Sequence, residues 1–118
     1  MARLPSEGSG VGIDPIRAAE LVAGGALLVD VREAHEWAAG RAPVAVHIPV
    51  DAVPDEMSGL PRDRLIIVIC RSGRRSAAVT DQLTGSGFDA VNLNGGAVAW
   101  VEAGLPFEAD DGGEGRVA

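Results

Sequence analysis

A run of six apolar residues, Leu65 to Cys70, places the tightest constraint on how this 118-residue chain can fold. The run has the length of a strand, and neither of its two faces carries a charged or strongly polar side chain. A strand that is apolar on both faces is typical of the centre of a parallel sheet whose two sides are covered by helices. The sequence therefore predicts a central strand that ends at Cys70.

Helical and extended segments alternate along the rest of the chain. Asp14 and Pro15 have the residue types of a helix cap and a first helical position, and glycines end most of the later segments. This alternation indicates an α/β fold, with a central, mostly parallel sheet flanked by helices on both faces. We expect helices at about 15–23, 33–39, 76–84 and 97–103, strands at 27–31, 44–48, 65–70 and 91–93, a loop or broken helix at 51–63, and both tryptophans, Trp37 and Trp100, in the core.

The length and the hydrophobic fraction of 47% allow one compact domain. Residues 1–12 are rich in Gly, Ser and Pro and are predicted to be flexible, so the domain is expected to span residues 13–108. Residues 109–118 are acidic and Gly-rich, and this composition predicts a disordered tail. A solubilising end is the favoured interpretation of the tail, and a docking element is the alternative.

Charge and hydropathy narrow the possible surroundings of the protein. No apolar run approaches the roughly 18 residues that cross a bilayer, and the N-terminus lacks the pattern of a secretion signal, so we expect a cytoplasmic protein. A net charge of −7 argues against nucleic acid and against an anionic membrane as partners. All ten basic residues are arginine, which is typical of a GC-rich bacterial genome.

Cys70 is the only cysteine, which excludes an intrachain disulfide and a multi-cysteine zinc site. A lone cysteine is most often a buried apolar filler, but it can also be a nucleophile. Here three of the ten arginines, Arg71, Arg74 and Arg75, follow it within five residues. An acidic chain has therefore concentrated positive charge beside its one thiol.

The segment 70–76 is expected to connect the central strand to a helix, a place where α/β sheets bind ligands. The helix N-terminus, the N–H groups of a loop turning at Gly73, and the arginines all favour a thiolate over a thiol. The sequence thus predicts Cys70 as a nucleophile within an anion-binding loop. The alternatives are an inert buried cysteine and, for any one arginine, a side chain that merely faces solvent. The residues predicted to bind the anion are Arg71, Ser72, Gly73, Arg74, Arg75 and Ser76.

The loop resembles that of the rhodanese-like (sulfurtransferase) domains, in which a cysteine is followed by a short loop ending in Arg-Ser. Three further segments resemble the same family, and they occur in the family's order. The resemblance covers roughly residues 13–108 and is to the single-domain type. The three segments are 28–33 (LVDVRE), 40–49 (GRAPVAVHIP) and 92–96 (NLNGG) with Trp100 and 104–106 (GLP).

The resemblance implies a sulfur transfer in two steps. The Cys70 thiolate takes the outer sulfur of a small anionic donor such as thiosulfate, and a persulfide forms. An acceptor, either cyanide or a thiol that can belong to another protein, then removes the sulfur. The resemblance implies no metal and no cofactor. Asp30 and Arg32 are expected near the loop as a supporting polar network, with a structural salt bridge that extends to Glu36 as the favoured interpretation.

The chain departs from the family pattern at three positions. Arg41, Ala42 and Val44 stand where the family usually has His, Ile and Gly. These positions lie outside the loop, so they affect the expected packing and turn rather than the expected chemistry. His47 is expected to be a packing or surface residue of a strand.

Two other functions remain open on the sequence. A cysteine-dependent phosphatase or arsenate reductase also holds its thiolate in an anion-binding loop, but its arginine typically follows the cysteine by six positions. Ser76 occupies that position here, and Arg75 comes five positions after the cysteine. The second alternative is a persulfide carrier or sensor that acts with a protein partner and turns over thiosulfate poorly.

Overall fold

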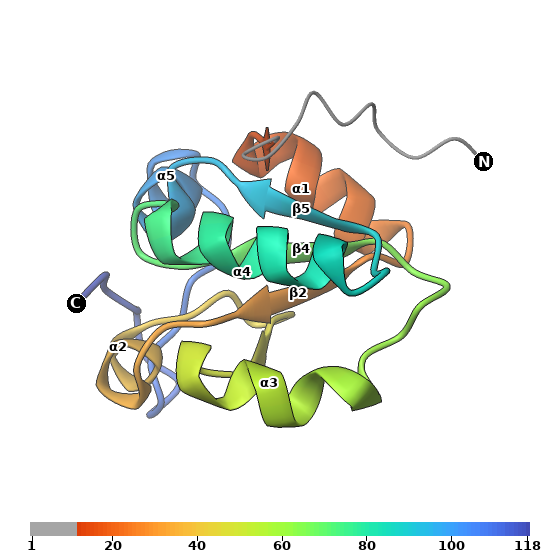
Figure 1. The fold of residues 1–118 in the computed structure, drawn as a ribbon. Coiled ribbons are helices and arrows are strands. Elements are labelled where there is room, and N and C mark those ends of the chain that lie inside the picture. The colour runs from red at the N-terminus through yellow and green to blue at the C-terminus, as the bar shows by residue number, and fades with distance from the viewer. Residues whose placement is uncertain (1–11) are drawn as a thin grey trace.

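The computed structural model describes residues 12–118, so all but the last residue of the predicted flexible segment 1–12 lies outside the described residues. Figure 1 shows a sheet with helices packed on both of its faces. All neighbouring strands are parallel, in the order β1-β5-β4-β2-β3, which confirms the predicted α/β class. The strands are β1 Gly12–Ile13, β2 Leu27–Asp30, β3 Val46–His47, β4 Ile66–Ile69 and β5 Ala90–Leu93.

Helices α1 and α5 cover one face of the sheet, and α3 and α4 cover the other. The cap predicted for the first helix is present, since Asp14 Oδ1 accepts the Arg17 N–H at 2.8 Å. Within residues 12–118 no helix is long and apolar enough to cross a membrane. The helices are α1 Pro15–Ala23, α2 Ala34–Ala39, α3 Val53–Glu56, α4 Arg74–Gly85 and α5 Gly96–Glu102, and short 3-10 turns at Val50–Ala52 and Met57–Gly59 flank α3, as the broken pattern of 51–63 predicts.

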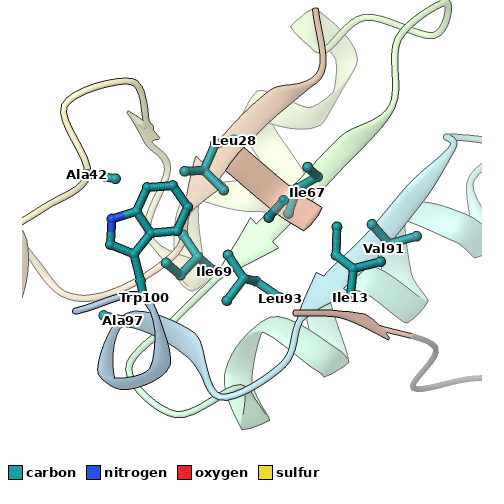
Figure 2. Packing of buried hydrophobic residues seen from close by; sticks show 10 residues of the cluster. Ile13, Leu28, Ala42, Ile67, Ile69, Val91, Leu93, Ala97 and Trp100 are labelled. Atoms are coloured by element: carbon teal, nitrogen blue, oxygen red, sulfur yellow. The ribbon is translucent and has the colours of Figure 1, made fainter. Parts of the chain in front are cut away.

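The central strand β4 places Cys70 on one particular face of the sheet. Side chains alternate along a strand, so Ile67 and Ile69 join the cluster of Trp100 beneath α1 and α5, which Figure 2 shows. Val68 and Cys70 belong to the opposite cluster, which packs under α4. The cysteine therefore leaves the strand on the side from which α4 begins.

Most element bounds differ from the prediction by one or two residues, and three of these differences affect the sheet or the loop after Cys70. Gly12, predicted to be flexible, pairs in β1 with Asn92 of β5. The strand expected at 44–48 is limited to Val46–His47, because Ala42 and Ala45 close a turn through an N–H···O bond of 3.0 Å. Helix α4 begins at 74 instead of 76, so the loop after Cys70 is shorter than expected.

The C-terminal residues, predicted to be disordered, pack against the domain instead. The backbones of Arg41 and Glu108 exchange two hydrogen bonds of 2.9 Å, and the Arg116 N–H donates to Ala39 O at 3.0 Å. Glycines permit this close approach, because a Cβ on Gly40 would lie 2.5 Å from Arg116 O. Composition alone predicts disorder here because it does not register backbone pairing.

The two tryptophans differ in their surroundings. Trp100 is buried in the core, as predicted, with 2% of its surface exposed. Trp37 lies outside the core, and the buried position on α2 belongs to Glu36. The Trp37 ring instead stacks on His47 with 4.7 Å between centroids, and the Arg41 guanidinium lies 4.7 Å above it.

Candidate active site

Cys70 follows the last residue of β4, and three residues separate it from the start of α4. The last of the three, Gly73, caps the helix with a φ of 104°. Only glycine adopts this left-handed conformation without strain. The chain can therefore turn sharply from the strand into the helix and direct its amides back toward the sulfur.

The Cys70 sulfur accepts two hydrogen bonds from this turn. The Gly73 N–H donates to Sγ at 3.1 Å, and the Ser76 hydroxyl donates to it at 3.2 Å. Cys70 is 1% exposed and Ser76 is fully buried, so both bonds are shielded from bulk water. The sequence predicts that Ser76 binds the anionic substrate, and in the structure its hydroxyl contacts the Cys70 sulfur itself.

The loop lowers the pKa of the Cys70 thiol. Burial alone would raise this pKa, but hydrogen bonds from the Ser76 hydroxyl and from the amides of Ser76, Gly73 and Ser72 outweigh it. Each of these donors favours the charged sulfur over the neutral thiol. The geometry therefore supports the thiolate that the sequence predicts, and most of the effect comes from donors within the loop.

Arg75, predicted to bind the anionic donor, is instead paired with Glu36. Its guanidinium nitrogens lie 2.8 and 2.9 Å from the two Glu36 carboxylate oxygens. The Arg75 hydrogen bonds hold the pKa of Glu36 down at about 2, although burial opposes the shift. The pair ties the first turn of α4 to α2 and uses two of the five N–H donors of Arg75.

Asp30 and Arg32 form a separate, buried ion pair. Arg32 has no exposed surface, and its NH2 lies 2.8 Å from Asp30 Oδ2. The same guanidinium donates to the carbonyls of Glu36 and Gly40 at 3.4 and 2.7 Å. The expected salt bridge between Asp30 and Arg32 is present. Arg32 contacts only the backbone carbonyl of Glu36, because the Glu36 carboxylate is paired with Arg75. The ion pair of Asp30 and Arg32 holds α2 against the end of β2 and makes no hydrogen bond to the sulfur.

The start of α5 holds the other arm of the loop. The Ala97 and Val98 amides donate to the carbonyls of Cys70 and Arg71 at 2.8 and 3.1 Å. A Cβ on Gly96 would lie 2.5 Å from Cys70 O and 2.6 Å from Arg71 O. The paired glycines of the sequence NLNGG therefore have a packing role that their spacing alone does not reveal.

The remaining predicted site residues lie at the exposed part of the loop. Arg71, Ser72 and Arg74 are exposed. Arg71 Nε donates to the main-chain oxygen of Ala118 at 3.0 Å, which brings the C-terminal residues to the edge of the site. Within residues 12–118 Arg74 has no ion pair. Arg71 and Arg74 are thus the two arginines placed to meet a ligand from solution.

Two functional candidates escaped the sequence analysis. Glu36 is expected there only as a partner of Arg32, and the available signal is its position three residues after Glu33, where the helix is expected to start. Asn92 was noted only as part of a resembling segment, yet its side chain donates to Gly73 O at 3.1 Å. A polar residue inside an otherwise apolar strand signals such a contact.

The three departures from the family pattern affect the packing of the C-terminal residues. Arg41 contacts Asp110 at 2.7 Å, in addition to lying over Trp37. Ala42 is buried, and Val44 is 56% exposed. Within residues 12–118, none of these three residues has a hydrogen bond or an ion pair with Cys70 or with residues 71–76.

Comparisons with known proteins agree with this fold. Residues 15–103 match the rhodanese-like domain family. The chain therefore belongs to the rhodanese-like domain family. A sulfurtransferase of Allochromatium vinosum is 42% identical over 87 residues, which cover 73% of this chain and 81% of that protein.

Two further proteins illustrate the range of the similarity. The thiosulfate sulfurtransferase GlpE of Pseudomonas savastanoi pv. phaseolicola is 33% identical, over 75% of this chain and 84% of its own. The crystal structure of a rhodanese-related protein from Thermoplasma volcanium is 31% identical and superposes with a TM-score of 0.77, over 82% of this chain and 96% of that one. The similarity thus extends over nearly the whole length of small, single-domain proteins.

Proposed function

We propose that this protein transfers sulfane sulfur from a small anionic donor, such as thiosulfate, to a thiophilic acceptor through a persulfide on Cys70. The observation that carries the proposal is the Cys70 sulfur at the end of the central strand, accepting hydrogen bonds from Gly73 and Ser76. These donors stabilise the negative charge on the Cys70 sulfur while it is a thiolate, both before it attacks the donor and when it leaves again in the second half-reaction. The sulfurtransferase names of the curated relatives support the same class of reaction.

The first half-reaction exchanges one sulfur–sulfur bond for another. The Cys70 thiolate attacks the outer sulfur of thiosulfate, and the bond between the two donor sulfurs breaks. Its electron pair leaves with sulfite, and the charge on the enzyme moves to the outer sulfur of the persulfide. The thiolate is required for this attack because the thiol is a poor nucleophile.

The second half-reaction returns the enzyme to its starting state. Cyanide or an acceptor thiolate attacks the outer sulfur of the persulfide, and the cysteine leaves as a thiolate. The products are thiocyanate or an acceptor persulfide. The low pKa of Cys70 favours this step as well, because a thiol of lower pKa is a better leaving group.

Two features support sulfur transfer over phosphate chemistry at this loop. Position 76, where a phosphatase loop would have its arginine, holds a serine whose hydroxyl contacts the sulfur. The preceding Arg75 is engaged by Glu36 and is not positioned as a free clamp for a tetrahedral phosphate. Turnover of a phosphate ester at a rate comparable to that of thiosulfate would reverse this preference.

The deciding experiment is the intact mass of the protein after incubation with thiosulfate. We expect a gain of one sulfur atom that cyanide or dithiothreitol removes, and no gain in Cys70→Ser. An unchanged mass for the wild-type protein would rule out the persulfide route. Steady-state thiosulfate:cyanide activity then distinguishes an enzyme from a persulfide carrier or sensor. A carrier would take up sulfur and bind a partner protein stoichiometrically, but its turnover of thiosulfate would be negligible.

The class of donor, the class of acceptor and the cellular location are each proposed on a different observation. The two exposed arginines of the loop favour an anionic donor, and the chemistry of a persulfide favours a thiol or cyanide as acceptor. A cytoplasmic location is proposed because a reducing compartment keeps a free cysteine such as Cys70 available as a thiol. The acceptor can be identified by incubating the sulfur-loaded protein with candidate thiols, and the acceptor then indicates the pathway.

A further inference from the structure

Gly73 is the residue on which the geometry of the sulfur site depends most. Its N–H reaches the Cys70 sulfur at 3.1 Å, and its φ of 104° lies in the left-handed region. Glycine adopts several conformations at similar cost. A glycine at the start of a helix therefore keeps one orientation only if its neighbours hold it there.

The first turn of α4 holds Gly73 through one long hydrogen bond. The Ala77 N–H donates to Gly73 O at 3.3 Å, and no side-chain hydrogen bond caps the helix at this end. A bond of this length is at the weak end of the normal range. The helix alone therefore leaves the orientation of Gly73 loosely fixed.

Asn92 supplies a second and shorter hydrogen bond to the same carbonyl. Its Nδ2 donates to Gly73 O at 3.1 Å from β5, where its backbone pairs with Val68 of β4 and with Gly12 of β1. The group that faces Gly73 O must be the NH2 group, because a carbonyl oxygen can only accept. The bond therefore connects the loop to a residue in the interior of the sheet.

Burying the Asn92 side chain in this strand costs free energy unless its amide makes a hydrogen bond. The residue is 5% exposed, in a strand whose other members are Ala90, Val91 and Leu93. Burial of an amide without a partner costs free energy that an apolar residue would not incur. Its bond to Gly73 is its only side-chain hydrogen bond within residues 12–118, so holding the loop is the use that the structure offers for this amide.

We propose that Asn92 is a positioning residue for sulfur transfer: its amide fixes the Gly73 carbonyl and so keeps the Gly73 N–H directed at the Cys70 sulfur. Asn92 does not contact the sulfur or the substrate, and it acts only through Gly73. The inference rests on the proposed sulfur transfer for its role, although its effect on the thiol can be measured separately. Without the amide, the Gly73 backbone can rotate about its φ and ψ angles. The Gly73 N–H then turns away from the sulfur, and the thiolate loses a hydrogen-bond donor.

The test measures the rate of Cys70 alkylation by iodoacetamide as a function of pH. Asn92→Leu preserves the approximate volume and removes the donor, and Asn92→Ala removes both. In each variant we expect the midpoint of the profile to move to higher pH. The rate below the wild-type midpoint should fall about tenfold, as expected when a hydrogen bond to a charged group is lost. At high pH the variants should react at least as fast as the wild type, because a more basic thiolate is the stronger nucleophile.

The control is Asn94→Ala, which removes an exposed amide from the same segment. It should retain the wild-type profile and wild-type thiosulfate activity. A folded Asn92→Leu protein, judged by its thermal unfolding, whose profile matches the wild type would overturn the proposal. A profile displaced equally by Asn94→Ala would overturn it as well, since the effect would not be specific to the amide on Gly73.

A measurement on the wild-type protein keeps the test decisive if both Asn92 variants fail to fold. In ¹H–¹⁵N spectra, the Gly73 amide and the Asn92 side-chain amide should shift together as Cys70 titrates. An Asn92 amide that stays unchanged while the Gly73 amide shifts would overturn the proposal. If instead the wild-type protein takes no sulfur from thiosulfate, the proposed function fails, and these titrations still decide whether Asn92 positions the loop.

Discussion

Arg75 and Glu36 form a two-point ion pair in which both guanidinium NH groups face the two carboxylate oxygens, at 2.8 and 2.9 Å. Glu36 also accepts the Glu33 N–H at 2.8 Å, so its carboxylate links the start of α2 to the start of α4. Helix α4 begins with the residues that position the sulfur site. The pair therefore fixes the helix that carries Ser76. Arg75 also interacts with the Cys70 thiolate through charge, because the thiolate adds to the effect of Glu36 in raising the pKa of Arg75.

Glu36→Gln should remove a pH-dependent part of the stability. The pKa of Glu36 is lowered from 4.5 to about 2, so the carboxylate stabilises the fold above pH 4.5 and this contribution is lost as the pH falls toward 2. We expect the wild-type advantage over the variant to shrink by about 1–2 kcal/mol between pH 6 and pH 3, after allowing for the partial exposure of Arg75. Urea unfolding at the two pH values measures this difference. Glu102→Gln, an exposed carboxylate outside any ion pair of residues 12–118, is the control, and an equal pH effect in both variants would contradict the assignment.

Ser76→Ala should raise the pKa of Cys70. The variant loses the hydroxyl that donates to the sulfur at 3.2 Å, which is the largest of the influences that lower this pKa. A hydrogen bond to a charged group contributes about 1.5–3 kcal/mol, so persulfide formation at neutral pH should slow at least tenfold. Stopped-flow alkylation across pH reports the shift. Ser86→Ala, which removes a hydroxyl just beyond the other end of α4, should behave as wild type, and a similar loss in that variant would point to general destabilisation.

Arg74→Ala should weaken donor binding without disturbing the fold. Arg74 is exposed and has no ion pair within residues 12–118, whereas Arg75 is paired with Glu36. A single exposed charge contributes up to about 1 kcal/mol. We therefore expect the KM for thiosulfate to rise up to about fivefold, with less difference at high salt, which screens the interaction. Arg75→Ala should instead lower the denaturation midpoint. If the two variants gave the same pattern, the distinction between a binding and a supporting arginine would be lost.

The central strand and the sharp turn into a helix after Cys70 could be predicted because their signals are local. An apolar run, a glycine and a cluster of arginines lie next to one another in the sequence, and each has a direct structural meaning. The residue types of Arg75 and Glu36 were visible too, but they are 39 positions apart. Nothing local distinguishes an arginine that binds a ligand from one that binds a distant carboxylate.

Two other features depend on contacts that composition does not encode. The C-terminal residues have the composition of a disordered tail, yet Gly40 and Gly115 let two stretches of backbone pass close to each other. A Cβ added to Gly115 would lie 3.0 Å from the Gly40 Cα. Asn92 and Gly96 belong to a short polar segment that resembles a family signature. Their use in holding the loop follows from the adjacency of β5 and β4, which only the sheet order establishes.

Arg41→Ala should loosen the C-terminal residues. The side chain contacts Asp110 at 2.7 Å and lies over Trp37, so the variant loses an ion pair and a cation–π contact. Hydrogen exchange should become faster at the Asp110 and Arg116 amides, which donate to the carbonyls of α2. Glu114→Gln alters a charge in the same segment that has no ion pair within residues 12–118, and should leave exchange unchanged. Unaltered exchange in Arg41→Ala would show that backbone pairing alone holds the segment.

Gly96→Ala tests whether the start of α5 must approach the loop as closely as it does. A Cβ at this position would lie 2.5 Å from Cys70 O, and the φ of 59° is unfavourable for alanine. The Ala97 and Val98 amides would have to withdraw from the carbonyls that they contact. We expect a loss of at least about 2 kcal/mol in unfolding free energy, together with slower alkylation of Cys70 in the folded protein.

Gly104→Ala is the matched comparison, because Gly104 also has a positive φ, 79°, but nothing lies within 4 Å of its added Cβ. Backbone strain alone should then cost about 1 kcal/mol and leave the alkylation rate at the wild-type value. The difference between the two variants isolates the contact with the loop from the conformational cost of alanine. Equal losses of stability, with equal alkylation rates, would show that α5 does not hold the carbonyls of Cys70 and Arg71 in place.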